Sequence, residues 1–108
     1  MATTYKVLGQ VAPSATTATS LYTVGSEKSA VVSTIAVCNR GSAGTFRLAI
    51  RPAGATLSNE HYVAYDSAIT ANNTTFITIG VTLAATDVVT VYASTADMSF
   101  SAFGSEIA

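Results

Sequence analysis

The chain has 108 residues, of which 49 % are hydrophobic and only 10 % are charged, against roughly a quarter charged in typical soluble proteins. This length corresponds to one domain, and the hydrophobic content excludes a disordered chain, which combines low hydrophobicity with high net charge. The formal net charge of −1, with only five Lys and Arg residues, excludes the clustered positive charge of a non-specific nucleic-acid binder and the charged outer faces of a coiled coil.

Eight stretches of β-branched, aromatic and alternating apolar residues predict strands. They cover residues 5–8, 21–24, 30–39, 45–51, 61–65, 74–79, 87–93 and 98–103. Turn-forming residues separate these stretches, and no window shows the sustained 3.6-residue apolar repeat of a helix. The sequence therefore predicts an all-β, single-domain antiparallel β-sandwich, jelly-roll-like, with about eight short strands.

The segment 11–20 stands apart because it consists of small, mostly polar residues without charge. It is either a plain loop or an arm that becomes ordered against a neighbouring subunit. We therefore divide the chain into an N-terminal strand and low-complexity arm at 1–20 and a β-sandwich domain at 21–108. In the second interpretation, Pro13, Thr16 and Thr17 are weak candidates for interface residues.

One stretch alternates strictly between apolar and polar residues. Phe46, Leu48 and Ile50 share one face, which we expect to lie in the core. Arg47 and Arg51 share the other face, roughly 13 Å apart at the spacing of a strand. They are either solvated charges or weak interface candidates that meet acids on a neighbouring subunit, since Arg is enriched at interfaces. The expected core comprises Phe46, Leu48, Ile50, Ile77, Val89, Val91 and Phe100.

Few residues offer catalytic chemistry. His61 is the only histidine and Cys38 the only cysteine, and neither belongs to a spacing typical of zinc ligands or of an activated nucleophile. We expect His61 to be an ordinary loop or strand-edge residue and Cys38 to be a buried thiol. Asp66 and Asp87 are expected to accept hydrogen bonds from the backbone of turns. The sequence therefore predicts no catalytic residue, no cofactor, no metal site and no enzymatic activity.

Targeting segments are also not visible. The first 20 residues lack the continuous apolar region of a secretory signal. No stretch approaches the roughly 18 consecutive apolar residues of a membrane helix. We therefore expect a soluble protein that is made without secretion and has no membrane partner.

Four segments resemble small virion proteins of tailed bacteriophages. They read VVSTIAVCN at 31–39, TFRLAIRP at 45–52, TDVVTVYA at 86–93 and FGSE at 103–106. The resemblance spans most of the chain from about residue 20 and includes no diagnostic catalytic motif. It implies a virion part without an enzymatic site. The implied role is a head-decoration (cement) protein, often trimeric on the capsid surface, or a small tail or fibre-associated subunit.

The low charge agrees with such an assembly role, because a free monomer usually keeps more charge on its outward strand positions to avoid association. We expect a non-enzymatic capsid decoration protein that stabilises the head through subunit interfaces, in the virion, assembled in the host cytoplasm. The expected partners are the major capsid protein and further copies of the chain, with a trimer favoured, and no nucleic acid. The alternative is a tail or fibre-associated subunit with a carbohydrate-binding role, for which five tyrosines but no tryptophan are available.

Overall fold

The computed structural model describes residues 2–108 and contains eight strands and two short 3-10 turns, with no α-helix in this range. The strands are β1 (Thr3–Val11), β2 (Thr19–Thr23), β3 (Ser29–Asn39), β4 (Gly44–Arg51), β5 (Tyr62–Ile69), β6 (Asn73–Leu83), β7 (Val88–Ala93) and β8 (Met98–Ile107). The 3-10 turns are η1 (Pro52–Gly54) and η2 (Asn59–His61). Every expected strand is confirmed. Most are longer than expected, because backbone pairing with a neighbouring strand also includes residues that do not follow the apolar-polar alternation.

The strands pair as one long hairpin that is rolled up. Counting from the two ends inward, β1 pairs with β8, β2 with β7, β3 with β6 and β4 with β5, all antiparallel. Two further antiparallel pairings, β3 with β8 and β4 with β7, close the roll. The result is two four-stranded sheets: sheet A in the order β1-β8-β3-β6, and sheet B in the order β2-β7-β4-β5. This arrangement is a jelly roll, as the sequence predicts.

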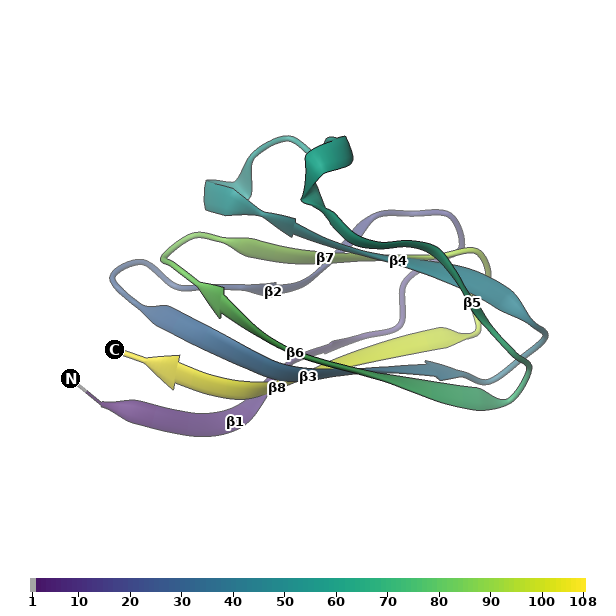
Figure 1. Cartoon of the computed structure of the whole chain (residues 1–108), viewed down its shortest axis with the longest axis horizontal. Helices are drawn as coiled ribbons and strands as arrows, with labels where there is room; N and C mark the ends of the chain where they lie inside the picture. The colour runs from purple at the N-terminus through teal and green to yellow at the C-terminus, as the bar shows by residue number, and fades with distance from the viewer. Residues whose placement is uncertain (1) are drawn as a thin grey trace.

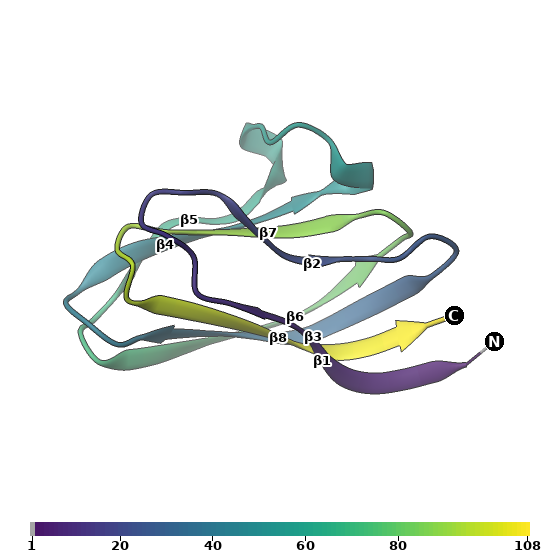
Figure 2. The same ribbon diagram turned by 180° about the vertical axis from the view of Figure 1, so that it is seen from behind.

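The two sheets lie one above the other, and every connection except that between β4 and β5 passes from one sheet to the other (Figure 1). The exceptional connection holds η1 and η2 and stands above sheet B (Figures 1 and 2). The chain ends lie side by side at one end of sheet A, where the N–H of Ala108 donates to the carbonyl of Ala2 at 2.9 Å. Both ends are therefore tied into the same sheet.

Apolar side chains fill the space between the sheets. Five of the seven expected core residues are buried, and the other two, Ile50 and Ile77, are half-buried and pack against the core. The rings of Phe46 in sheet B and Phe100 in sheet A meet edge to face, with their centroids 6.3 Å apart. Because this contact crosses from one sheet to the other, it helps to hold the two layers together.

The N-terminal residues belong to the sandwich. β1 is an outer strand of sheet A, and β2 begins at Thr19, so the boundary expected between residues 20 and 21 falls inside a strand. Residue 1 of the expected 1–20 unit lies outside the described residues. The low-complexity segment forms the loop 12–18 between the sheets, and the N–H of Thr16 donates to the carbonyl of Ala93 at 2.7 Å. In the single chain, this segment is therefore a loop attached to the end of β7.

Loss of the central aromatic contact is expected to destabilise the fold strongly. Phe100 is 1 % exposed, so Phe100→Ala should lower the free energy of unfolding by about 3–5 kcal/mol through lost burial and the cavity left behind. Phe76→Ala is the matched control, because Phe76 is 69 % exposed and its truncation should change stability by no more than about 0.5 kcal/mol. Urea unfolding measures both values. Equal effects of the two changes would contradict the assigned core.

Candidate functional site

Sheet A turns an uncharged face to the outside. Within its four described strands, the only charged residues are Lys6 and Glu106. Both turn toward the inner side, where the Glu106 carboxylate accepts hydrogen bonds from Lys6 Nζ at 3.1 Å and from the hydroxyl of Tyr22 at 2.7 Å. Tyr22 is a buried residue of sheet B. The outer positions of sheet A are therefore left to Thr, Ser, Gln and apolar side chains.

Large apolar side chains are exposed on both outer strands of sheet A. Tyr5 and Val7 on β1 are 83 % and 48 % exposed, and Phe76 and Ile79 on β6 are 69 % and 44 % exposed. Removing apolar surface from water is favourable by about 25 cal/mol per Å², so a partner that covers these side chains gains binding energy. Among residues 2–108, four of the six exposed large apolar side chains lie on sheet A, and the other two, Val63 and Tyr65, lie on sheet B. Exposed apolar groups of this kind make the outer face of sheet A a candidate surface for contact with another macromolecule.

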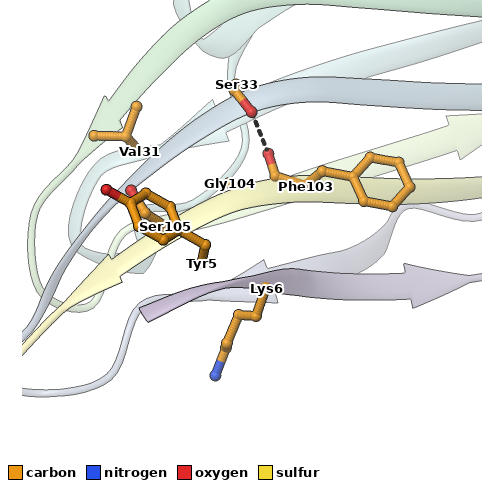
Figure 3. A pocket seen from close by; sticks show the side chains of 7 residues that line it. All are labelled: Tyr5, Lys6, Val31, Ser33, Phe103, Gly104 and Ser105. Carbon is orange, nitrogen blue, oxygen red and sulfur yellow. Dashed lines mark hydrogen bonds between the residues drawn. The ribbon is translucent and has the colours of Figure 1, made fainter. Parts of the chain in front are cut away.

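This outer face contains a hollow of about 390 Å³ beside Tyr5 (Figure 3). Lys6 belongs to its lining, but the Lys6 side chain points away from Ser33 and Gly104. An irregularity in β3 places Ser33 at the hollow, where its hydroxyl donates to the carbonyl of Phe103 at 3.0 Å. The adjacent Gly104 lacks a side chain because a Cβ there would collide with the carbonyl oxygen of Val31. The Tyr5 ring extends over β8 and forms an aromatic wall of the hollow.

β6 is the least protected edge of the sandwich, whose outer strands are β1, β2, β5 and β6. β2 has only five residues, β1 carries a charged residue and a register shift, and β5 has two register shifts against β4. Residues 73–78 of β6, in contrast, pair with β3 without interruption and contain neither a charge nor a proline. Such an edge leaves backbone N–H and C=O groups available to a further strand.

Sheet B differs, because it carries a charged cluster around Arg47 on its outer side. The guanidinium carbon of Arg47 lies 4.2 Å from the ring centroids of both Tyr65 and Tyr92. Arg47 Nε donates to Asp66 Oδ1 at 2.7 Å, and Nη2 donates to Oδ2 at 3.4 Å. The hydrogen bond to Asp66 raises the pKa of Arg47 further above its ordinary value. The guanidinium is thus held between two rings and paired with a carboxylate.

The expectation that Asp66 lies in a turn is wrong, since it lies within β5 and pairs with Arg47. Its φ of 49° is in the left-handed region, which Asp tolerates better than most residues. The register between β4 and β5 shifts at this point, so that two residues of β5 oppose one residue of β4. Consequently both Tyr65 and Asp66 reach Arg47, although regular alternation would turn them to opposite faces.

The second acid expected in a turn is confirmed there. The carboxylate of Asp87 accepts hydrogen bonds from the N–H groups of Ala84 and Ala53, each at 2.8 Å. It therefore stabilises the turn before β7 and also fixes η1 against that turn. This contact holds one end of the segment that stands above sheet B.

A second hollow, of about 380 Å³, lies beside the Arg47 cluster and is lined by Asn59, Tyr62 and Tyr65. The rings of Tyr62 and Tyr65 meet edge to face, with centroids 4.8 Å apart and planes at 80°. No motif in the sequence points to this hollow. The one available signal is the pair of tyrosines three residues apart, and their proximity to Arg47 arises only when β5 pairs with β4.

Both arginines proposed as interface candidates have partners within the chain. Arg47 is paired with Asp66, as described above. Arg51 Nε donates to the hydroxyl of Thr90 at 3.0 Å, and its Nη1 donates to the carbonyl of Ala55 at 3.0 Å. Arg51 thereby fastens the segment after η1 to sheet B. In this structure the two arginines act in intramolecular contacts.

The three candidates in the loop 12–18 differ in exposure. Pro13 is buried, so it contributes to the packing of the loop, whereas Thr16 and Thr17 are exposed. The hydroxyls of these threonines donate to the carbonyl of Ala15 at 2.7 and 3.1 Å. The two exposed threonines remain the members of this group that a partner protein could contact directly.

The residues with catalytic or metal-binding chemistry do not form a cluster. His61 Nδ1 accepts a hydrogen bond from the N–H of Ser58 at 3.1 Å, which places it in η2 at the start of β5, as expected. Cys38 is half-buried and not buried as expected, because the alternation of β3 turns it to the outer side of sheet A. Among residues 2–108, no group of three His, Cys, Asp or Glu residues is placed to hold a metal ion. No helix in that range has the length and apolar character needed to cross a membrane.

Comparisons of the chain with protein-family models, with curated proteins and with solved structures found no match. The jelly roll alone assigns no activity, because this architecture serves unrelated functions. The two sheets offer different chemistry: sheet A has an uncharged outer face with an unprotected edge, and sheet B has a hollow lined by aromatic and polar groups. These two surfaces are the candidate functional sites.

A separate polar cluster around Glu106 joins the two sheets near the chain ends. Lys28 Nζ lies 3.6 Å from Glu106 Oε1, in addition to the hydrogen bonds from Tyr22 and Lys6. These hydrogen bonds, first that from Tyr22 and then that from Lys6, lower the pKa of Glu106. Burial, followed by the contact with Glu106, raises the pKa of Tyr22. The cluster therefore favours a charged carboxylate beside a neutral phenol.

The stability lost when this carboxylate is replaced should depend on pH in a defined direction. Because the folded-state pKa of Glu106 is lowered, its contribution is present above the unfolded-state value of about 4.3 and is lost as the pH falls through the folded value. We expect Glu106→Gln to lower the free energy of unfolding by about 1–2 kcal/mol at neutral pH, after allowance for the solvent around the lysines, and by less in acid.

Glu27→Gln provides the control for this measurement, because Glu27 is exposed and has no side-chain partner among the described hydrogen bonds. Urea unfolding at several pH values should give nearly the same curve for Glu27→Gln and the unchanged protein. A Glu106→Gln effect that grows as the pH falls would contradict the stabilising role of the charged carboxylate.

Proposed function

We propose that this chain is a non-enzymatic structural protein of a tailed-bacteriophage virion and acts as a capsid decoration (cement) protein. The outer face of sheet A binds neighbouring virion proteins, above all the major capsid protein, and copies of the chain associate with one another. The observation that carries this proposal is the uncharged outer face of sheet A with its exposed aromatic side chains. The resemblance of segments 31–39, 45–52, 86–93 and 103–106 to small virion proteins supplies the virion context.

The dimensions of sheet A suit such an interface. The molecule is 44 Å long and 20 Å across its shortest axis. Figure 1 looks down this shortest axis and shows the two sheets edge-on, one above the other. The four strands of sheet A have 9 to 11 residues each, so at about 3.3 Å per residue and about 4.8 Å between strands one face covers roughly 600–700 Å². This area approaches the roughly 800 Å² that each partner buries in a standard protein interface. Modest binding energy at each copy is sufficient for a decoration protein, because the same contact is repeated over the whole shell.

The chemistry of the face also determines how binding responds to salt. An interface without formal charges on this chain gains little from long-range attraction, and salt screens little of what holds it. Burial of Tyr5, Val7 and Phe76 supplies the binding energy instead. Binding of this kind should therefore persist at high ionic strength.

The alternative is a small tail or fibre-associated subunit that uses the same face to bind tail proteins. The two functions differ in location, which cryo-electron microscopy of the intact particle determines directly. Density for this jelly roll over the capsid lattice supports decoration, and density confined to the tail or fibres supports the alternative.

A charge placed on the contact face should prevent attachment to the particle. We expect Phe76→Glu to weaken binding to capsids that lack this protein by about tenfold or more, because the carboxylate would be buried without a partner. Since Phe76 is 69 % exposed, the variant should remain folded, which circular dichroism can check. Co-sedimentation with capsids at low and high salt measures the binding.

Val63→Glu is the matched control, because Val63 is also an exposed apolar strand residue, at 51 %, but lies on β5 of sheet B. It should bind capsids like the unchanged protein. The proposal fails if the unchanged protein never attaches to particles and stays monomeric at high concentration, or if the two glutamate variants weaken attachment equally.

A further inference from the structure

We propose that the hollow lined by Asn59, Tyr62 and Tyr65 is a binding site for an uncharged saccharide. The hollow lies on sheet B, beside η2, whereas the contact face of the proposed function is the outer side of sheet A. The site therefore adds a second activity to an assembly protein: while sheet A is attached to a partner, sheet B can bind a sugar in solution or on another surface.

The walls of the hollow suit the apolar side of a sugar ring. Tyr62 and Tyr65 stand nearly perpendicular to each other, with their ring centroids 4.8 Å apart, and Tyr65 is 56 % exposed. Tyrosine offers a rigid apolar ring and a polar hydroxyl in one side chain. The C–H groups of a pyranose can pack against the ring, while its hydroxyls remain close to polar groups.

The third lining residue supplies those polar groups. The side-chain amide of Asn59 provides two donors and an acceptor, and each tyrosine hydroxyl can donate and accept. None of these groups has a partner among the side-chain hydrogen bonds described for residues 2–108. A few convergent polar groups beside aromatic walls are typical of a small-molecule site.

The aromatic wall is held in place before any ligand binds. The Tyr65 ring packs on the guanidinium of Arg47, which Asp66 fixes by two hydrogen bonds. The left-handed backbone at Asp66, with φ of 49°, directs both of these β5 residues toward Arg47. Preorganisation of this kind lowers the conformational entropy that binding would otherwise cost.

The surrounding charges favour a neutral ligand. Arg47 is neutralised by Asp66 at 2.7 Å, so it offers no free positive charge to an acidic sugar. The neighbouring Glu60 is itself negative, and hydrogen bonds from its own backbone and from Ser58 lower its pKa. The residues that line the hollow therefore offer an anionic saccharide no cation, and the residue next to Asn59 in the chain is an acid.

The size of the hollow limits the ligand further. Its volume of about 380 Å³ falls at the lower end of the range of roughly 300–1,000 Å³ for small-molecule pockets. This space suits a monosaccharide or the end of a short glycan. An extended peptide is the competing occupant and is included as an outcome of the test.

The test is a nuclear magnetic resonance titration of the full chain with glucose, galactose, mannose and N-acetylglucosamine, and with glucuronic acid as the anionic counterpart. We expect at least one neutral sugar to shift the amide signals of Asn59, Tyr62 and Tyr65, and glucuronic acid to bind more weakly. Tyr65→Ala should weaken binding of that sugar by about tenfold, as expected for the loss of one aromatic contact.

Two further variants make the result specific. Tyr5→Ala removes another exposed tyrosine, which lies on sheet A, and should leave sugar binding unchanged. Asn59→Ala removes only an exposed amide, so it should keep the fold and still weaken binding. The inference is overturned if no neutral sugar shifts these signals, if glucuronic acid binds more tightly, if a peptide library binds there in place of sugars, or if Tyr65→Ala and Tyr5→Ala behave alike. Failure here leaves capsid attachment through sheet A intact, so the two proposals fail separately.

Discussion

Burial of apolar side chains between two sheets is the interaction on which the rest of the molecule depends. Each strand turns one face inward, and the edge-to-face contact of Phe46 with Phe100 crosses from one sheet to the other. Once the inner face of a strand is committed to the core, its geometry leaves only the alternate residues for the outside. The character of each outer surface is therefore a consequence of how the core is filled.

The few charged side chains of the strands are used in contacts within the chain, and this leaves the two outer faces unlike each other. Lys6 and Glu106 turn inward and join the sheets near the termini, while Arg47 and Asp66 pair on the outside of sheet B. Sheet A is left without a charge that would oppose a partner. The low charge of the sequence favours a covered surface, and the structure places the uncharged surface on the outer side of sheet A. Sheet B carries the fixed aromatic and polar cluster.

Only part of the candidate sites could be predicted from the sequence. Alternation correctly placed Arg47 on an outer face, opposite Phe46 and Leu48, but its partner lies 19 residues away at Asp66. Periodicity cannot show the irregularity in β5 that brings Asp66 and Tyr65 to the same side, because one extra residue cancels the expected alternation. Its position depends on how β5 fits against β4.

The sequence by itself determined the strands and the sandwich, because short alternating stretches must bury one face and the turns between them limit how they connect. It also determined that the surface would be poor in charge. Only the tertiary structure decided that Cys38 faces outward, that Phe76 lies on an unprotected edge, and that Tyr62 and Tyr65 border a hollow. These features depend on strand order and register, which arise from contacts between residues far apart in the chain and leave no local pattern.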